Sequence, residues 1–179
     1  MTRLALGHGV VMREVAESDA AALAEAYRRN RDRLAPWEPE RAESFFTDAG
    51  QASAIDAMVR DRDAGSGVPF VLEAEERIVG RLNLSGIVRG PFLSANLGYW
   101  IDGDLGGRGV TTAAVDAVAR VAADDLGLHR LQAATLLHNA PSKAVLRRCG
   151  FTEIGVAPGY LQIAGRRQDH LLFQRILAD

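Results

Sequence analysis

A glycine-rich turn between an apolar strand and a helix is the part of the sequence best suited to chemistry. The residues Leu97–Ile101 predict a strand, and a helix follows because the apolar residues from Ala113 to Ala122 recur at three- and four-residue spacing. Between them lie four glycines, Gly103, Gly106, Gly107 and Gly109. Such a turn leaves backbone N–H groups unpaired at the positive end of the helix dipole. Because glycine lets an anion approach the backbone, the pattern is typical of a phosphate site.

The order of residues in the turn excludes two common phosphate loops. A dinucleotide-binding turn has a third glycine three residues after its Gly-x-Gly pair, and here Thr112 stands at that place. A Walker loop ends in Gly-Lys-Ser/Thr, and Lys143, the only lysine, lies outside the turn. From the turn alone, a phosphate loop and a strand-to-helix turn without a ligand stay open as alternatives.

Composition and charge indicate a soluble intracellular protein. The chain has 179 residues, 47% of them hydrophobic and 25% charged, with a net charge of −2. These values predict a single domain over residues 1–179. Without charge runs or a long apolar segment, we expect no membrane and no nucleic-acid binding. Cys149 is the only cysteine, so an intramolecular disulfide is excluded. The four histidines lack metal-type spacing, so we expect no metal. The sequence shows no signal-peptide segment, from which we expect a cytoplasmic location.

The elements around the turn predict a mixed α/β (α+β) fold. We expect further strands at Gly9–Val15, Pro69–Glu73, Ile78–Leu84, Leu131–Leu137, Phe151–Val156 and His170–Ile176, with a loop at Gly86–Pro91. We expect helices from a Ser18 N-cap to about Asn30, over Ala49–Arg62 and over Ser142–Arg148. The run of strands in the middle favours a mostly antiparallel twisted sheet over a doubly wound parallel one.

The segment Asn30–Arg41 is expected to be irregular and to present an aromatic side chain. Pro36 and Pro39 restrict their neighbours and interrupt a helix, with Trp37 and Glu38 between them. Trp37 could be exposed beside the Glu38 carboxylate and form one wall of a binding site. The sequence fits equally well with a buried Trp37 that closes one end of the hydrophobic core.

Three motifs in a fixed order resemble a known family. They are the strand, glycine turn and helix; Asn139 followed by Ser142; and the run Arg148–Phe151. Together they resemble the GNAT N-acetyltransferases. The stretches Asn30–Arg41 and Gly159–Leu172 are similar to the RimJ/RimL branch, which acetylates protein N-terminal amines. The resemblance implies a central sheet flanked by helices, with a splayed strand pair that holds CoA, and it favours the phosphate-loop interpretation of the turn.

The resemblance implies an acetyl-CoA site built on the glycine turn. The residues expected to bind CoA are Trp100, Ile101, Gly106, Gly107, Arg108, Gly109, Val110, Thr111, Asn139 and Ser142. We expect the diphosphate on the N–H groups from Gly107 to Thr111, and an N–H such as that of Ile101 at the thioester carbonyl. The family's usual Gln or Arg is replaced by Gly106, and its final small residue by Thr111, whose hydroxyl can donate to a phosphate.

Proton transfer is expected to involve a serine and a mild base. Many GNAT enzymes carry a tyrosine acid seven residues after the asparagine, but Leu146 stands there, so the resemblance implies Ser142 as the proton donor to the CoA sulfur. Glu38 and His138 are the candidate bases, with Glu40 and Glu43 as alternatives to Glu38. An α-amine has a pKa of about 7.7–8.0 and is roughly a tenth neutral at pH 7, so a mild base is enough to deprotonate it. The residues expected on the acceptor side are Trp37, Glu38 and Tyr160.

The favoured function is acetyl transfer from acetyl-CoA to the N-terminal α-amine of a protein, of Ala or Ser type. The resemblance implies a ribosomal protein as the acceptor. Two alternatives stay open: an N-acyltransferase for a small-molecule amine, and a non-catalytic module that binds CoA or a protein partner. The sequence is compatible with a monomer or a homodimer, and with a larger acyl group.

Overall fold

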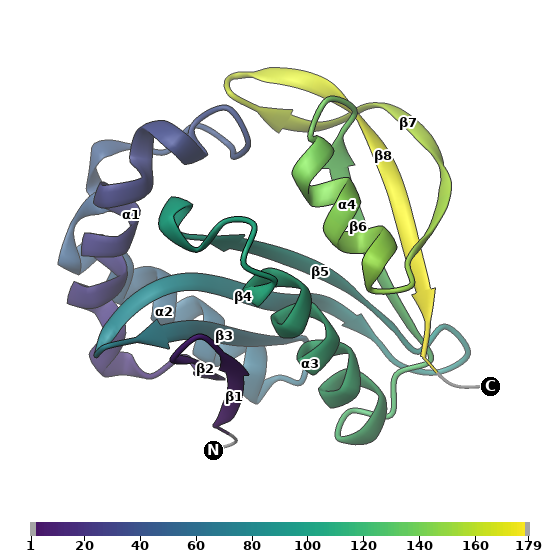
Figure 1. Ribbon diagram of the computed structural model, residues 1–179, viewed down its shortest axis with the longest axis horizontal. Coiled ribbons are helices and arrows are strands. Elements are labelled where there is room, and N and C mark those ends of the chain that lie inside the picture. The colour runs from purple at the N-terminus through teal and green to yellow at the C-terminus, as the bar shows by residue number, and fades with distance from the viewer. Residues whose placement is uncertain (1–2, 178–179) are drawn as a thin grey trace.

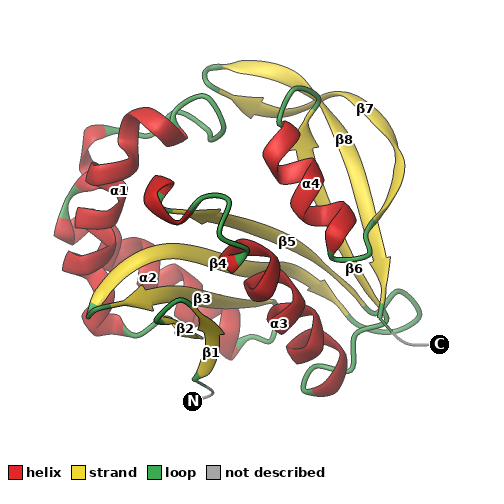
Figure 2. Ribbon diagram, in the orientation of Figure 1, coloured by secondary structure: helices red, strands yellow, loops and turns green. Residues whose placement is uncertain are grey.

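The computed structural model describes residues 3–177, which form an eight-stranded sheet with helices on both faces (Figures 1 and 2). The strands are β1 (Leu4–Gly7), β2 (Val10–Glu14), β3 (Gly67–Ala74), β4 (Arg77–Val88), β5 (Ser94–Ile101), β6 (Arg130–Leu136), β7 (Thr152–Ile163) and β8 (Arg166–Ile176). The helices are α1 (Ala20–Leu34), α2 (Asp48–Asp63), α3 (Val110–Asp124) and α4 (Ala140–Arg148). Short 3₁₀ turns span Glu17–Asp19, Glu43–Phe46 and Gly103–Leu105. In this part of the chain no helix is long and apolar enough to cross a membrane.

The sheet is split in its middle, where β5 and β6 diverge. The strand order is β1-β2-β3-β4-β5-β6-β8-β7, and every pair is antiparallel except β5 and β6. The parallel pair is joined only from Ser94 to Asn96, opposite Arg130 to Gln132. Beyond these residues the two strands separate, which confirms the predicted splayed pair and the mixed α/β fold.

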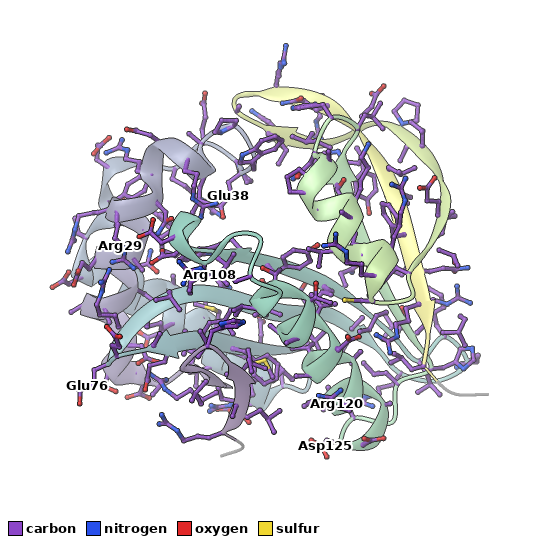
Figure 3. All side chains as sticks on the ribbon, in the orientation of Figure 1. Arg29, Glu38, Glu76, Arg108, Arg120 and Asp125 are labelled. Atoms are coloured by element: carbon purple, nitrogen blue, oxygen red, sulfur yellow. The ribbon has the colours of Figure 1, made fainter. Side chains whose placement is uncertain are left out.

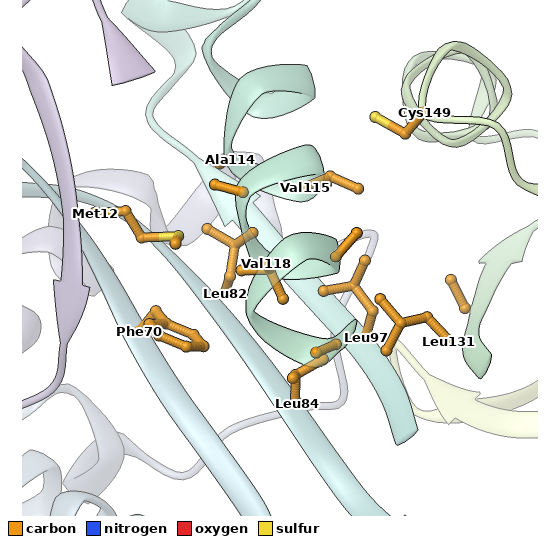
Figure 4. Packing of buried hydrophobic residues seen from close by; sticks show 14 of the residues in the cluster. Met12, Phe70, Leu82, Leu84, Leu97, Ala114, Val115, Val118, Leu131 and Cys149 are labelled. Carbon is orange, nitrogen blue, oxygen red and sulfur yellow. The ribbon is translucent and has the colours of Figure 1, made fainter. Parts of the chain in front are cut away.

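Two apolar clusters hold the helices to the sheet. On one face α3 packs against the central strands, because its small and β-branched residues lie on one side of the helix (Figure 4). Those residues are Val110, Ala114, Val115, Ala117, Val118 and Ala122. On the other face α1 and α2 pack through Leu23, Tyr27 and Ile55 against the strand residues Val71 and Trp100. The alternation of β4 and β5 residues between the two faces therefore fixes which side chains can enter a site at the split.

Two expectations for the N-terminal segment are wrong. The strand β1 is not predicted, because its four residues have no fully buried position and form only the edge of the sheet. Ser18 does not cap the first helix; it is exposed within a 3₁₀ turn. The buried Asp19 stands at the N-cap of α1, but its carboxylate bonds backward, accepting from the Ala16 N–H at 2.8 Å and from the Arg13 guanidinium, so it fixes the 3₁₀ turn before the helix.

The helix α1 continues one turn past the predicted boundary at Asn30. The Asn30 side chain is buried and donates back to the Ala26 carbonyl at 2.9 Å, so it satisfies its amide within the helix instead of ending it. Pro36 then stops the helix soon after Leu34. The irregular segment is therefore shorter than predicted and begins close to Trp37.

In the C-terminal half, three strands are longer than the sequence predicts. β4 continues to Val88 through residues predicted as a loop, and β7 and β8 extend well beyond the predicted Phe151–Val156 and His170–Ile176. Most β7 side chains are exposed, so this strand shows no alternation from which its length could be read. The two strands form a long hairpin whose tip lies beside the end of α1, where the Ala164 N–H donates to the Glu38 carbonyl at 3.0 Å.

Candidate active site

The glycine turn holds a row of free N–H groups at the start of α3. Gly107 and Gly109 have φ of 75° and 81°, a conformation that side chains disfavour, and Gly109 directly precedes the helix. In the described structure no backbone acceptor meets the N–H groups of Gly107, Gly109, Val110 and Thr111. These groups point outward at the positive end of the helix dipole, which suits a phosphate.

Two members of the predicted CoA set make bonds within the turn itself. The Gly106 N–H donates to Gly103 at 2.9 Å, and the Arg108 N–H donates to Leu105 at 3.4 Å. Their backbone groups are therefore less available to a ligand than those of Gly107 to Thr111. The Arg108 side chain is exposed on the turn (Figure 3).

A cavity of about 420 Å³ lies against this turn, and we call it the loop cavity. It is lined by Arg33, Leu34, Trp37, Tyr99, Trp100, Ile101, Asp102, Gly103, Gly106, Gly107, Thr111, Asn139, Pro141, Ser142 and Val145. It thus reaches from the free N–H groups to the split between β5 and β6. Seven of the ten residues predicted to bind CoA line it, and the other three, Arg108, Gly109 and Val110, lie next to lining residues along the chain.

The edge of β5 that faces the split offers backbone groups to a ligand. Asp102 donates its N–H to the Val79 carbonyl at 2.7 Å, and Ile101 lies opposite Gly80. Because successive residues of a strand point their N–H groups to opposite edges, the N–H groups of Ile101 and Tyr99 face away from β4, toward the split. The Ile101 N–H therefore faces the split and is available to a ligand there.

A hydrogen-bond network around the buried Asn30 and Asp102 joins α1 to the end of β5, and its exposed Arg33 adds a cation to the loop cavity. Asp102 accepts from Arg29 at 2.9 Å and from the Asn30 amide. The Asn30 oxygen accepts from Arg33 at 2.9 Å, and Arg33 also donates to the Ile101 carbonyl. Sequence reasoning missed Arg33, because only the fold brings α1 against a strand some seventy residues later in the chain.

A second cavity of about 390 Å³, the inner cavity, meets the loop cavity at the split. The two share Leu34, Trp37, Tyr99, Trp100, Asn139 and Ser142. The polar residues that line the inner cavity but not the loop cavity include Glu38, Arg41, Arg81, Asn83, Thr135 and His170. A third space of about 270 Å³, the outer hollow, continues from it along Glu38, Pro39 and Arg41 toward Glu40 and Phe46. Together these spaces form a path from the surface to the split.

Glu38 is the predicted base that lies in the inner cavity. It follows the end of α1 (Figure 3), and its carboxylate lies 3.9 Å from the Arg41 guanidinium. Burial raises the pKa of the Glu38 carboxyl, and Arg41, Arg81 and Arg33 oppose that shift. A carboxylate that is partly desolvated holds a proton more strongly than an exposed one, which suits a mild general base.

The other predicted acceptor-side residues lie at the edges of this space. His138 is exposed and stacks on Trp37 with ring centroids 5.3 Å apart, but it lines neither cavity. Tyr160 is also exposed, with its ring 5.6 Å from that of His170. His170, which sequence reasoning missed, is buried and lines the inner cavity. Its Nδ1 lies 2.9 Å from the Gln168 carbonyl, which can only accept, so Nδ1 donates to it.

A pair of hydroxyl groups lies where the two cavities meet. The Tyr99 hydroxyl is 2.9 Å from the Ser142 Oγ, and either can be the donor. Burial raises the pKa of Tyr99 to about 12, so the pair keeps its protons at neutral pH. Asn139 caps α4 by accepting from the Ser142 N–H at 3.1 Å, and α4 begins at Ala140, not at Ser142 as predicted. The cap fixes Ser142 and leaves the Asn139 NH₂ free for a ligand.

Comparison with known proteins decides the family. The pattern of the acetyltransferase (GNAT) domain matches residues 10–152. This chain belongs to the GNAT acetyltransferase family. The predicted recognition is confirmed, and the enzyme is an N-acetyltransferase. Among residues 3–177, no three His, Cys, Asp or Glu side chains gather in a way that would hold a metal ion.

Similar GNAT proteins include enzymes that act on ribosomal proteins. The ribosomal protein uS5-alanine N-acetyltransferase of Escherichia coli (strain K12) is 36% identical over 165 residues, which cover 91% of this chain and 85% of that protein. The crystal structure of the ribosomal-protein-S5-alanine acetyltransferase from Vibrio fischeri has a TM-score of 0.95 at 32% identity and covers 100% of this chain and 98% of the other. The structure of Mycobacterium smegmatis RimJ in complex with CoA-disulfide has a TM-score of 0.89 at 31% identity and covers 93% of this chain and 81% of the other.

Proposed function

We propose that this enzyme transfers the acetyl group of acetyl-CoA to the α-amine of a protein N-terminus, and that the acceptor is a ribosomal protein. The observation that carries the proposal is that the outer hollow, the inner cavity and the loop cavity adjoin one another through shared lining residues. An extended peptide can enter along Pro39 and Arg41 and bring its terminal amine to the split, where the loop cavity ends. A closed pocket for a small amine would not need the outer hollow. The relatives that act on ribosomal proteins support the same class of acceptor.

The loop cavity fits the chemistry of CoA. The free N–H groups between Gly107 and Thr111 suit its diphosphate, and the edge of β5 suits the amide groups of its pantetheine arm. The Asn139 NH₂ can donate to a pantetheine carbonyl while its oxygen caps α4. When bound, acetyl-CoA supplies an acyl group activated as a thioester. The Ile101 N–H would stabilise negative charge on the thioester oxygen.

The remaining residues move protons between the acceptor and the sulfur. Glu38 accepts a proton from the entering ammonium group, which leaves a neutral amine to attack the thioester carbon. The new C–N bond forms as the C–S bond breaks, and the sulfur leaves as a thiolate. Ser142 donates its proton to that thiolate and recovers one from Tyr99, whose hydroxyl is 2.9 Å away. The attacking nitrogen loses its second proton to water, water returns one proton to Tyr99, and Glu38 releases the proton it took to solvent. His138 stacks on Trp37 but lines neither cavity, whereas Glu38 lines the inner cavity, so Glu38 is the better placed base.

Replacing Gly109 with alanine is expected to raise the Kd for CoA about tenfold, because a side chain at φ of 81° disfavours the loop by about 1–2 kcal/mol. Isothermal titration calorimetry with CoA measures the change. Gly127→Ala is the matched control, since Gly127 also has a positive φ of 60° with open space around it but lies at the far end of α3. Equal Kd values for the two variants would show that the Gly109 loop does not hold CoA.

The function is tested by offering the enzyme two panels of acceptors with acetyl-CoA and measuring thiol release. One panel holds short peptides with free Ala, Ser or Met N-termini, and the other holds aminoglycosides, spermidine and free amino acids. We expect turnover on the peptides alone. Turnover on small amines alone would replace the proposed acceptor with a small molecule. CoA binding without turnover on either panel would favour the non-catalytic module.

A further inference from the structure

Among residues 3–177, Asn83 is the only amide or hydroxyl side chain of the inner cavity that makes no hydrogen bond to protein. The others, which all have partners, are Tyr27, Tyr99, Thr135, Asn139 and Ser142. Asn83 lies on β4 and is half-buried, and both its Oδ1 and its Nδ2 keep accessible surface. A ligand in the cavity can therefore reach a free acceptor and a free donor on the same side chain.

A glycine on the neighbouring strand lets the Asn83 amide lie in the inner cavity. Gly98 stands opposite Asn83 on β5, and a Cβ built on Gly98 would lie 3.2 Å from the Asn83 Oδ1 and 3.6 Å from its Nδ2. Asn83 also lines a pocket of about 90 Å³ beside β3, but Gly98 lines the inner cavity and not that pocket. The polar end of Asn83 therefore covers the backbone of β5 inside the cavity.

The distance from Asn83 to the split indicates which part of an acceptor it would meet. Gly98 directly precedes Tyr99, whose hydroxyl meets Ser142 at the split, where the amine must react. One residue of a strand spans about 3.3 Å, so the Asn83 amide lies close to that place. In a peptide the first carbonyl carbon is two bonds, about 2.5 Å, from the α-amine nitrogen. A peptide with its amine at the split thus presents its first peptide unit to Asn83.

We propose that Asn83 is a specificity residue that binds the first peptide unit of the acceptor, donating from Nδ2 to its carbonyl and accepting from its N–H at Oδ1. This rests on the proposed function and deepens it, because it explains how the site selects peptides. A polyamine has no peptide unit and would leave both groups of Asn83 unpaired. A free amino acid offers a carboxylate but no N–H, and Glu38 already places negative charge in this cavity.

The test compares two acceptors that differ only in the first peptide unit. One is a peptide that begins Ala-Gly, and in the other an ester oxygen replaces the first peptide N–H. The amide-to-ester ratio of kcat/KM is measured for the wild-type enzyme and for Asn83→Leu, which keeps the size of the side chain without its polar atoms. We expect the wild-type ratio to exceed that of the variant about fivefold, as for one hydrogen bond. The different basicity of the two amines cancels in this comparison.

Asn96→Leu is the matched control, since Asn96 is an exposed asparagine of β5 that lines none of the three spaces, and it is expected to keep the wild-type ratio. We expect Asn83→Leu to leave the Kd for CoA unchanged, because Asn83 does not line the loop cavity. Equal ratios in the wild-type enzyme and Asn83→Leu, with both acceptors acetylated, would overturn the role of Asn83 and leave the proposed function standing. No acetylation of either acceptor by the wild-type enzyme would overturn both.

Discussion

Glu38→Gln is expected to lower kcat/KM for an N-terminal peptide about 10²-fold, at the lower end of the range for loss of a general base. The glutamine keeps the size of the side chain and its place in the inner cavity but cannot take a proton from the entering ammonium group. A thiol-release assay with acetyl-CoA and an Ala peptide at pH 7 measures the effect. Glu40→Gln removes a neighbouring carboxylate that lines only the outer hollow, and it is expected to change the rate little.

The pH dependence distinguishes a base from a residue that only binds. Glu38 acts as the carboxylate, so the rate falls as the pH drops through its pKa. Because burial raises that pKa, against Arg41, Arg81 and Arg33, the fall begins at a higher pH than for an exposed glutamate. We expect Glu38→Gln to lack this acid limb, and His138→Asn and His170→Asn to keep it. An acid limb that disappears in a histidine variant and persists in Glu38→Gln would assign the base to that histidine.

Ser142→Ala is expected to lower kcat about 10²-fold, because the departing thiolate loses its positioned proton donor. The Kd for acetyl-CoA is expected to change little, since the Ser142 N–H that caps α4 through Asn139 remains. Tyr99→Phe is expected to cause a smaller loss of about tenfold, because it removes the partner that reprotonates and orients Ser142. Pre-steady-state thiol release measures the change in the rate of acetyl transfer, and calorimetry measures the change in the Kd for acetyl-CoA.

Ser53→Ala is the control for Ser142→Ala. Ser53 is an exposed serine of α2 whose hydroxyl donates to Ala49, away from both cavities. If Ser142→Ala retained the wild-type kcat, the proton would reach the sulfur by another route, and the role assigned to the hydroxyl pair would be wrong. If it weakened CoA binding as strongly as turnover, Ser142 would be a binding residue.

The loop cavity could be anticipated from the sequence because its chemistry is local. The glycines, the strand before them and the helix after them are contiguous, and their spacing alone indicates free N–H groups at a helix start. Asn139 and Ser142 are three residues apart, so their contact also follows from local geometry. Two details differ: the Gly106 N–H is used within the turn, and α4 begins at Ala140 with Asn139 as its cap, not at Ser142.

The inner cavity could not be anticipated in the same way, because distant segments build it. Tyr99 and Ser142 meet only because α4 packs over the split in the sheet, and Arg81 enters through the alternation of β4. His138 stood out because it precedes Asn139, yet the buried imidazole belongs to His170, on a strand whose length the exposed β7 pattern concealed. These contacts depend on tertiary packing, which no periodicity in the sequence records.

The most direct test of the account is to map the acetyl group on a peptide that carries both a free α-amine and an internal lysine. The peptide, with a serine N-terminus, is incubated with the enzyme and acetyl-CoA at pH 7, and tandem mass spectrometry locates the modification. The account predicts acetylation of the α-amine alone, because that amine is partly neutral at this pH and fits the path to the split. Acetylation of the lysine with a free α-amine would contradict it.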